Sequence, residues 1–372
     1  MDFDLKTDMP YRYLGNTGLK VSVLSFGTML MSYEQEDIDK WLECAKAAYE
    51  AGVNYFDSAE FYGLGQGDRN LGKAIREFGW DRKDLVIAIK IYRGGAGVNS
   101  YGMSRKHIIE GTLKSLKNMQ LDYCDLVFSH RSSYEIDLEE TCKAFDWLIR
   151  KGYAKYWCTS MWSNELITEA IKLCEANGYH PPVADQCEYS CLKRDHVEVN
   201  YRRLFERFRY GTTTWSPLCG GILTGKYNDG NIPAGDRYEN PIIKQMMWDQ
   251  YMGPNVIEKT LKSTNAMAKF AEELGCTQAQ LALAWIIVNT DVSTCIMGAT
   301  RPSQIESNVA ALKVAAEWNE EKESKMAEIL DNEPMPRMDW ETFGLDKPRR
   351  PISVTYDFKL KTLHRRKKLL RY

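Results

Sequence analysis

Short apolar runs alternate along the chain with longer segments in which apolar residues recur every three to four positions. The longer segments predict helices, for example at 37–52, 104–120, 138–152 and 164–178. The short runs are rich in β-branched and aromatic residues and are bounded by turn residues, which predicts strands at 21–27, 53–59, 85–91, 124–130, 154–160, 182–188, 211–217 and 293–299. Strands that alternate with helices in this way favour a parallel sheet with right-handed crossovers.

The predicted helix ends carry suitable capping residues. Ser104 opens one helix with a hydroxyl that suits the N-cap position. Four helices are expected to end at a glycine in the left-handed conformation, namely Gly52, Gly79, Gly152 and Gly178.

Eight strand–helix units at a spacing of roughly 30 residues predict a single-domain α/β fold, the (β/α)8 TIM barrel. A doubly wound open sheet is the main alternative, and such sheets usually carry a glycine-rich turn after the first strand. The corresponding turn reads GTMLMSY and lacks the GxGxxG pattern. The barrel is therefore favoured.

Two segments do not follow this alternation of strands and helices. A long stretch rich in Gly and Asn follows the seventh predicted strand at 218–241, and loops of this length at the carboxyl end of a barrel are typical of functional sites. We expect the barrel to occupy 11–333 and a basic extension to follow at 334–372. Residues 347–372 carry ten Lys and Arg against one acidic residue. A solvated extension and a basic helix that binds an anionic surface or partner both remain open.

Composition narrows the class of protein. Lys and Arg number 49 against 51 Asp and Glu, a net charge of −2, which excludes a generally basic nucleic-acid binder. The first residues lack the pattern of a secretory signal, and the longest strongly apolar stretch, at 281–288, is too short to span a membrane. Ten cysteines without a CxxC pair and five histidines without HExxH predict reduced thiols in a cytoplasmic protein and no metal site.

Chemically capable side chains gather where the predicted strands end. Asp57 closes the second strand and Tyr62 follows it, Lys90 lies within the apolar third strand, and His130 follows the fourth. A core ion pair would explain Lys90 and Asp57 alone. Because unpaired buried charges are costly, an Asp, a Lys, a Tyr and a His at one barrel mouth instead indicate an active site.

These four residues resemble the catalytic pattern of the aldo-keto reductase family. Gly18, the sequence WSPL after the seventh strand and the segment GATRPSQIESN at 298–308 are also similar to that family. Within it, the segments at 104–111, 188–199 and 215–227 resemble the β subunits of voltage-gated potassium channels and their fungal and plant relatives. The resemblance covers about residues 11 to 333 and excludes the basic tail.

The resemblance implies an NADPH-dependent oxidoreductase that reduces aldehydes or ketones to alcohols by hydride transfer. Tyr62 would be the general acid, Lys90 would lower its pKa, and Asp57 would hold the ammonium in place. His130 would donate a hydrogen bond to the carbonyl oxygen of the substrate.

Positions that would bind NADP(H) follow from the same resemblance. Thr28 and Gln35 align with nucleotide or substrate contacts, and Ser160 and Gln186 with contacts to the carboxamide. Trp215 would stack on the nicotinamide, unless it is a core aromatic. The pyrophosphate would be held by Ser216, Pro217, Leu218, Cys219, Gly220, Lys226 and Arg237.

The adenosine 2′-phosphate end would be held by Gly298, Thr300, Gln304 and Asn308. Two residues depart from the channel-subunit pattern, since Ser307 replaces a glutamate and Met161 an arginine. Arg301 either restores a phosphate contact or is an ordinary surface residue.

Two functions remain open. One is a reductase of small carbonyl compounds, and the other is a cofactor-binding regulatory β subunit of a membrane channel. His130 favours the enzyme, because the animal channel subunits carry Asn at that position. Only about ten residues precede Tyr11, which leaves little room for an inactivating N-terminal arm. The resemblance also suggests a homotetramer, which no sequence feature establishes.

Overall fold

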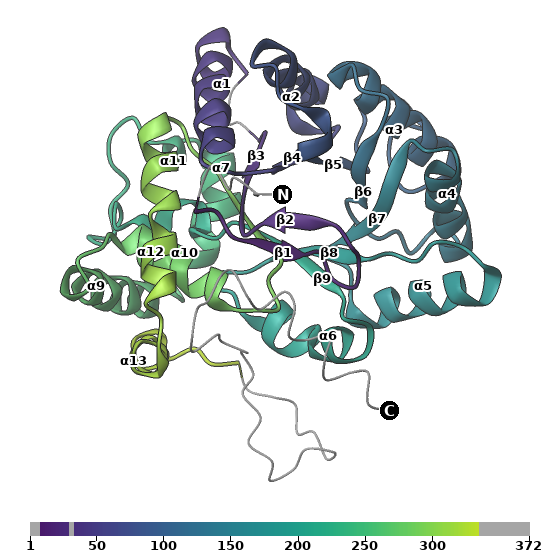
Figure 1. The fold of residues 1–372 in the computed structure, drawn as a ribbon. Coiled ribbons are helices and arrows are strands. Elements are labelled where there is room, and N and C mark those ends of the chain that lie inside the picture. The colour runs from purple at the N-terminus through teal and green to yellow at the C-terminus, as the bar shows by residue number, and fades with distance from the viewer. Residues whose placement is uncertain (1–7, 30–32, 335–372) are drawn as a thin grey trace, which may run out of the picture.

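Eight parallel strands close into a barrel in the computed structural model, which describes residues 8–29 and 33–334 (Figure 1). Each strand pairs with its neighbours in chain order, and the last pairs with the first to close the ring. The strands are β3 (Leu24–Gly27), β4 (Tyr55–Asp57), β5 (Val86–Ile91), β6 (Cys124–Ser129), β7 (Ala154–Ser160), β8 (Ala184–Glu188), β9 (Gly211–Trp215) and β10 (Thr294–Met297). The predicted (β/α)8 barrel is confirmed.

Helices surround this barrel and connect its strands (Figure 1). They include α1 (Gln35–Glu50), α2 (Gln66–Glu77), α3 (Arg105–Met119), α4 (Leu138–Arg150), α5 (Asn164–Asn177), α6 (Arg202–Phe208), α9 (Ile257–Glu273), α10 (Gln278–Val288), α11 (Pro302–Val309), α12 (Ala311–Ala316) and α13 (Glu320–Leu330). The hydroxyl of Ser104 accepts a hydrogen bond from the backbone N–H of His107 and caps α3. The four glycines expected to end helices all have positive φ, as predicted: Gly52, Gly79, Gly152 and Gly178.

An N-terminal hairpin corrects the first predicted strand. Residues 21–27 do not form one strand: β2 (Lys20–Ser22) pairs antiparallel with β1 (Tyr11–Tyr13), and β3 begins only at Leu24. The change of direction occurs next to Ser22, whose hydroxyl donates to the carbonyl of Leu24. The apolar run continues across this break, so hydrophobic periodicity alone does not show it.

The hairpin lies against the amino ends of the barrel strands. Leu14 and Val21 share a buried cluster with Tyr55, Val86 and Ala184, the first residues of β4, β5 and β8. Apolar side chains therefore fill the barrel interior at this end. The carboxyl ends of the strands remain available for polar chemistry.

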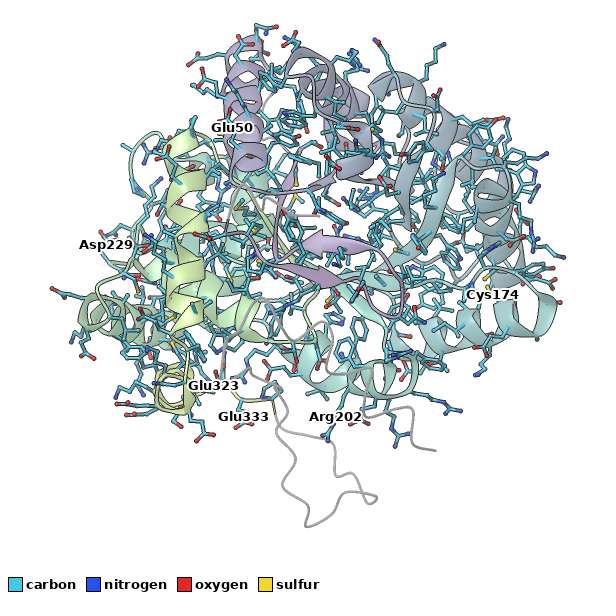
Figure 2. The ribbon with its side chains drawn as sticks, in the orientation of Figure 1. Glu50, Cys174, Arg202, Asp229, Glu323 and Glu333 are labelled. Atoms are coloured by element: carbon cyan, nitrogen blue, oxygen red, sulfur yellow. The ribbon has the colours of Figure 1, made fainter. Side chains whose placement is uncertain are left out.

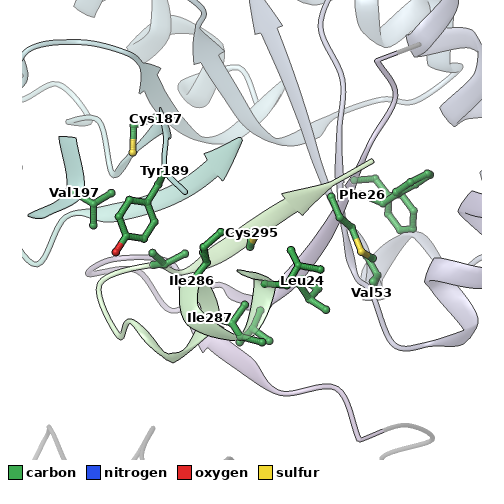
Figure 3. Close-up of a cluster of buried hydrophobic side chains, with 14 of the residues drawn as sticks. Leu24, Phe26, Val53, Cys187, Tyr189, Val197, Ile286, Ile287 and Cys295 are labelled. Carbon is green, nitrogen blue, oxygen red and sulfur yellow. The ribbon is translucent and has the colours of Figure 1, made fainter. Parts of the chain in front are cut away.

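A larger hydrophobic core lies between the strands and the surrounding helices. Figure 3 shows part of it, where Leu24 and Cys295 of the paired strands β3 and β10 lie near Ile286 and Ile287 of α10. Strands buried on both faces read as nearly continuous apolar runs, which is why their positions were predictable. Charged side chains such as Glu50 and Arg202, labelled in Figure 2, lie on the outer elements instead.

The long segment after β9 is folded into short turns. It contains η4 (Cys219–Thr224), η5 (Arg237–Glu239), α7 (Pro241–Ile243), η6 (Lys244–Trp248) and α8 (Asp249–Met252). Tyr227, Tyr238 and Trp248 pack against one another with ring centroids 5.2–5.6 Å apart. This aromatic cluster gives the segment a fixed shape beside the barrel mouth.

The basic extension lies outside the described residues apart from Pro334, so its role and the domain boundary at 333/334 stay predictions. Within the described part of the chain, no helix is both long and apolar enough to cross a membrane. The ten cysteines all lie within the described residues and form no disulfide bond with one another.

Candidate active site

An ion pair occupies the interior of the barrel toward its carboxyl end. Lys90 extends from β5 and hydrogen-bonds the carboxylate of Asp57, the last residue of the neighbouring β4, and also the carbonyl of Ser58 at 2.9 Å. The side chains of Lys90 and Asp57 are only 1% and 4% exposed. Burial lowers the pKa of Lys90, and the charge of Asp57 acts against that shift. The pair explains how two charges are tolerated in this interior.

Tyr62 lies directly above this pair. It begins the turn η1 (Tyr62–Gly65) between β4 and α2, where Gly63 and Leu64 have φ of 56° and 50°. The Lys90 ammonium is 5.0 Å from the centroid of the Tyr62 ring. A lysine in the third predicted strand and a tyrosine after the second therefore meet, as the sequence suggests.

The pKa of Tyr62 shifts in the direction opposite to the expected one. Burial raises it, the charge of Asp57 raises it further, and Arg131 acts in the other direction. The expected lowering by Lys90 is not the net result, because the ammonium is already paired with Asp57. Tyr62 is therefore a protonated phenol over the whole physiological pH range.

His130 follows β6 and faces the same centre. Its ring lies edge-on to that of Tyr62, with centroids 6.4 Å apart and planes at 89°. Burial lowers the pKa of His130 to about 2, helped by the positive charges of Lys90, Arg131 and Arg93. The imidazole is neutral at physiological pH and has one N–H to donate.

Gln186 and Ser160 adjoin the ion pair from β8 and β7. The Gln186 amide donates to the second carboxylate oxygen of Asp57 at 2.9 Å, and the Ser160 hydroxyl donates to the backbone carbonyl of Gln186 at 2.9 Å. Both side chains are buried. The two residues expected at a carboxamide are thus joined to each other and to Asp57.

Trp215 ends β9 at the same edge of the barrel. It is half-buried and belongs to neither hydrophobic cluster, so the alternative of a core aromatic does not hold. No other aromatic ring among the described residues packs against it. Its indole is therefore partly open to solvent at this edge of the barrel.

The turn after β9 has an unusual backbone. Ser216, Cys219 and Gly220 have φ of 53°, 48° and 64°, with Pro217 and Leu218 between them. Gly221 is left-handed as well, and the backbone N–H groups of Cys219 and Gly221 donate to the carbonyls of Ser216 and Leu218 at 2.9 and 2.8 Å. The Cys219 side chain is buried and its thiol donates to the hydroxyl of Ser190.

Lys226 and Arg237 lie close to this turn. The Arg237 guanidinium is 3.4–3.5 Å from the positions where side chains on Gly220 and Gly221 would begin. Lys226 is ion-paired with Asp236, which the sequence gave no reason to expect. A cation beside a left-handed turn fits the pyrophosphate of a dinucleotide.

The remaining cofactor positions do not all converge. Thr28 is buried and its hydroxyl donates to Ser58, next to the ion pair. The Gln35 amide instead donates to Asp39 on its own helix and is exposed. Its predicted contact has no support from this arrangement.

The segment after β10 forms a separate group. Thr300 donates from its backbone N–H and its hydroxyl to Gln304 at the start of α11, at 2.8 and 3.2 Å. Gly298 is open to solvent, and Asn308 is buried in the helix. Arg301 is exposed at the helix start, which is compatible with a phosphate contact and with an ordinary surface role.

Sequence reasoning missed a buried carboxyl next to the site. Asp68 of α2 accepts a hydrogen bond from Ser58 at 2.7 Å, and burial raises its pKa to about 6. Helical spacing places it on the same face as the buried Leu71 and Ile75, and that is the signal that could have revealed it.

The groups gathered at the barrel mouth are suited to proton transfer. A phenol stands above a buried cation, a neutral imidazole lies beside it, and both face the barrel mouth. This set can give a proton to an oxygen atom on which negative charge develops. No cluster of metal-ligating side chains occurs among the described residues.

Comparisons with known proteins agree with this chemistry. The model of the aldo/keto reductase family matches residues 23–331. The chain is 40% identical over 326 residues to a probable voltage-gated potassium channel subunit beta of Arabidopsis thaliana, with 88% of this chain and 98% of that protein covered. A putative subunit of the same kind from Schizosaccharomyces pombe is 42% identical over 333 residues, with coverages of 88% and 95%.

Proposed function

The chain belongs to the aldo/keto reductase family, and from that membership we propose that it is an NADPH-dependent reductase of aldehydes or ketones. The observation that carries the proposal is the buried Lys90–Asp57 pair beneath the ring of Tyr62, with His130 alongside. A merely structural ion pair needs neither a phenol above it nor a neutral imidazole next to that phenol.

The fit of a nicotinamide dinucleotide rests on three features. Trp215 offers a half-buried aromatic surface, Ser160 and Gln186 offer a buried polar pair, and the left-handed turn at Gly220 offers a cradle for phosphate. When bound, the reduced nicotinamide supplies a hydride to the carbonyl carbon of the substrate.

The protein supplies the proton. Since burial raises the pKa of Tyr62, its O–H stays intact until negative charge grows on the carbonyl oxygen, and then the proton moves to that oxygen and gives the alcohol. The phenolate that remains is stabilised by the Lys90 ammonium 5.0 Å from the ring centroid. A proton from solvent at the barrel mouth restores the phenol.

His130 orients the carbonyl group. As a neutral ring it donates one hydrogen bond to the carbonyl oxygen, and this hydrogen bond becomes stronger as negative charge develops on that oxygen. Gln186 holds Asp57, and Asp57 holds Lys90, so their hydrogen bonds fix the ammonium under the phenol.

A steady-state assay of purified protein on a panel of neutral aldehydes, with NADPH and NADH in parallel, tests this proposal. We expect NADPH to be consumed in step with alcohol formation. A protein that binds NADPH and turns over no member of a broad panel contradicts the proposal.

A second function is favoured by the names of the relatives, which are probable or putative voltage-gated potassium channel β subunits. As such a subunit, the protein would bind the cofactor and sense its redox state, in a four-fold assembly on a channel. Cofactor binding without turnover, together with retention on a channel's cytoplasmic domain, would support this function over the first.

A further inference from the structure

Two arginines stand at the mouth beside the catalytic groups. Arg93 follows β5, which carries Lys90, and Arg131 follows β6, directly after His130. Arg131 donates to the hydroxyl of Ser160 at 3.3 Å. Both guanidinium charges contribute to the low pKa of His130, and that of Arg131 also acts on Tyr62. Their fields therefore reach the reacting centre.

Neither arginine has a carboxylate partner among the described residues. Other arginines do, as Arg82 with Asp125 and Arg194 with Glu198 show. Asp57, the acidic residue at the reacting centre, is already paired with Lys90.

The two cations also act unfavourably on each other. Arg93 contributes to the lowered pKa of Arg131, after the larger effect of burial. Asp185 acts on Arg131 in the opposite sense, but its carboxylate is buried and already accepts hydrogen bonds from Thr159 and Tyr201. Both side chains are exposed and neither has a carboxylate partner among the described residues, so an anionic group can reach them.

Aromatic side chains flank this place. The Arg93 guanidinium lies 5.8 Å from the ring centroid of Phe61 and 5.6 Å from that of Tyr101. Both rings are unusually open for aromatic residues, at 45% and 53% exposed. A ligand with an apolar part and an anionic group could place the apolar part against these rings and the anionic group against the guanidinium groups.

We propose that Arg131 and Arg93 bind a carboxylate on the substrate, so that carbonyl compounds carrying a carboxylate are the preferred substrates. This inference rests on the proposed reductase function. A planar carboxylate matches the fork of N–H donors on a guanidinium, which favours carboxylate over a less directional anion.

The anion is not the phosphate of the dinucleotide. The cradle at Gly220 follows β9, whereas Arg93 and Arg131 follow β5 and β6. In the closed barrel β6 is separated from β9 by β7 and β8, and β5 lies one strand further away. The cradle has its own cation in Arg237.

The test compares two substrates that differ in one charge, 4-carboxybenzaldehyde and methyl 4-formylbenzoate, on NADPH-loaded full-length protein. For the wild type we expect kcat/KM to be at least about tenfold higher for the carboxylate. In Arg131→Gln and Arg93→Gln the loss for the carboxylate should exceed the loss for the ester by about tenfold or more, chiefly through KM. Arg131→Lys should restore part of the preference.

Arg202→Gln is the matched control, because it removes one positive charge from α6 at the outer edge of the molecule (Figure 2). We expect it to leave the preference unchanged. A wild type without preference, or equal losses for both substrates in Arg131→Gln, would overturn the inference while the reductase function stands.

If the wild type reduces neither compound, the reductase proposal fails instead. Titration of NADPH-loaded protein with benzoate, followed by tryptophan fluorescence, then decides the anion site separately. Saturable binding that weakens in Arg131→Gln supports the site, and absence of saturable binding overturns it.

Discussion

The imidazole of His130 stands edge-on to the phenol of Tyr62, with ring centroids 6.4 Å apart and planes at 89°. One ring comes from the turn after β4 and the other from the end of β6, so β5 and its Lys90 lie between them. A carbonyl oxygen placed at this corner can meet a phenol O–H and an imidazole N–H together. The chemistry of the site follows from this relationship.

His130 should not titrate in the working range of the enzyme. Its pKa is lowered to about 2, so kcat/KM for a neutral aldehyde at saturating NADPH should show no step near the usual histidine pKa of about 6.5. His130→Asn should lower kcat far more than it changes the dissociation constant of NADPH. A wild-type pH profile with a step near 6.5 that His130→Asn abolishes would show a histidine that is charged in the enzyme.

Gly220→Ala should damage the phosphate cradle. A methyl group there would begin 2.3 Å from the Tyr238 hydroxyl, at a φ of +64° that disfavours alanine. We expect NADPH affinity to fall by roughly tenfold or more, measured by quenching of protein fluorescence.

Gly235→Ala is its control in the same loop, since it also has positive φ but nothing lies within 4 Å of the added atom. An equal loss of affinity in both variants would mean that backbone strain, and not the cradle, decides cofactor binding, and no loss in Gly220→Ala would contradict the cradle.

NADPH should bind more tightly than NADH. The segment from Gly298 to Asn308, with Arg301 exposed at the start of α11, motivates this expectation, because each good charged contact to the 2′-phosphate contributes about 1.5–3 kcal/mol. Dissociation constants measured for the two cofactors should differ by more than tenfold. Agreement within about threefold is incompatible with a bound 2′-phosphate.

Asp68→Asn should stabilise the fold at high pH only. The pKa of Asp68 is raised from 3.8 to about 6 in the folded protein. The protonated carboxyl therefore makes its full contribution to stability below pH 3.8, and this contribution is lost as the pH rises through 6. Asparagine resembles the protonated form, so urea unfolding should show a gain of roughly 1–3 kcal/mol at pH 8 and little change near pH 4.

The exposed Asp195 supplies the control, because Asp195→Asn should change stability by a similar small amount at both pH values. A stabilisation of Asp68→Asn that is independent of pH would mean that Asp68 is ionised in the folded protein at both.

The barrel, and the convergence of Asp57, Tyr62, Lys90 and His130 at one of its ends, were predictable because both depend on local sequence. Lys90 is a charge inside an apolar strand and Asp57 ends one, and the carboxyl ends of parallel strands necessarily share one edge. The hairpin strand at Lys20–Ser22 was not predictable in this way, since the apolar pattern runs through Ser22 without interruption.

Pairings between distant side chains could not be predicted from the sequence either. Lys226 was expected at a phosphate, yet its ammonium is bound to Asp236, and Gln35 bonds along its own helix. The rise in the pKa of Tyr62 depends on burial and on the pairing of Lys90 with Asp57. Such properties arise from three-dimensional contacts that residue spacing does not specify.

The most direct test of the mechanism is the rate of carbonyl reduction by Tyr62→Phe, with NADPH binding measured on the same preparation. The substitution removes one hydroxyl and leaves the ring above Lys90, so NADPH affinity should stay close to that of the wild type. Reduction of a reactive neutral aldehyde should fall by roughly 10² or more, the usual scale for the loss of a general acid. Undiminished turnover in Tyr62→Phe would contradict the assignment of Tyr62 as the proton donor.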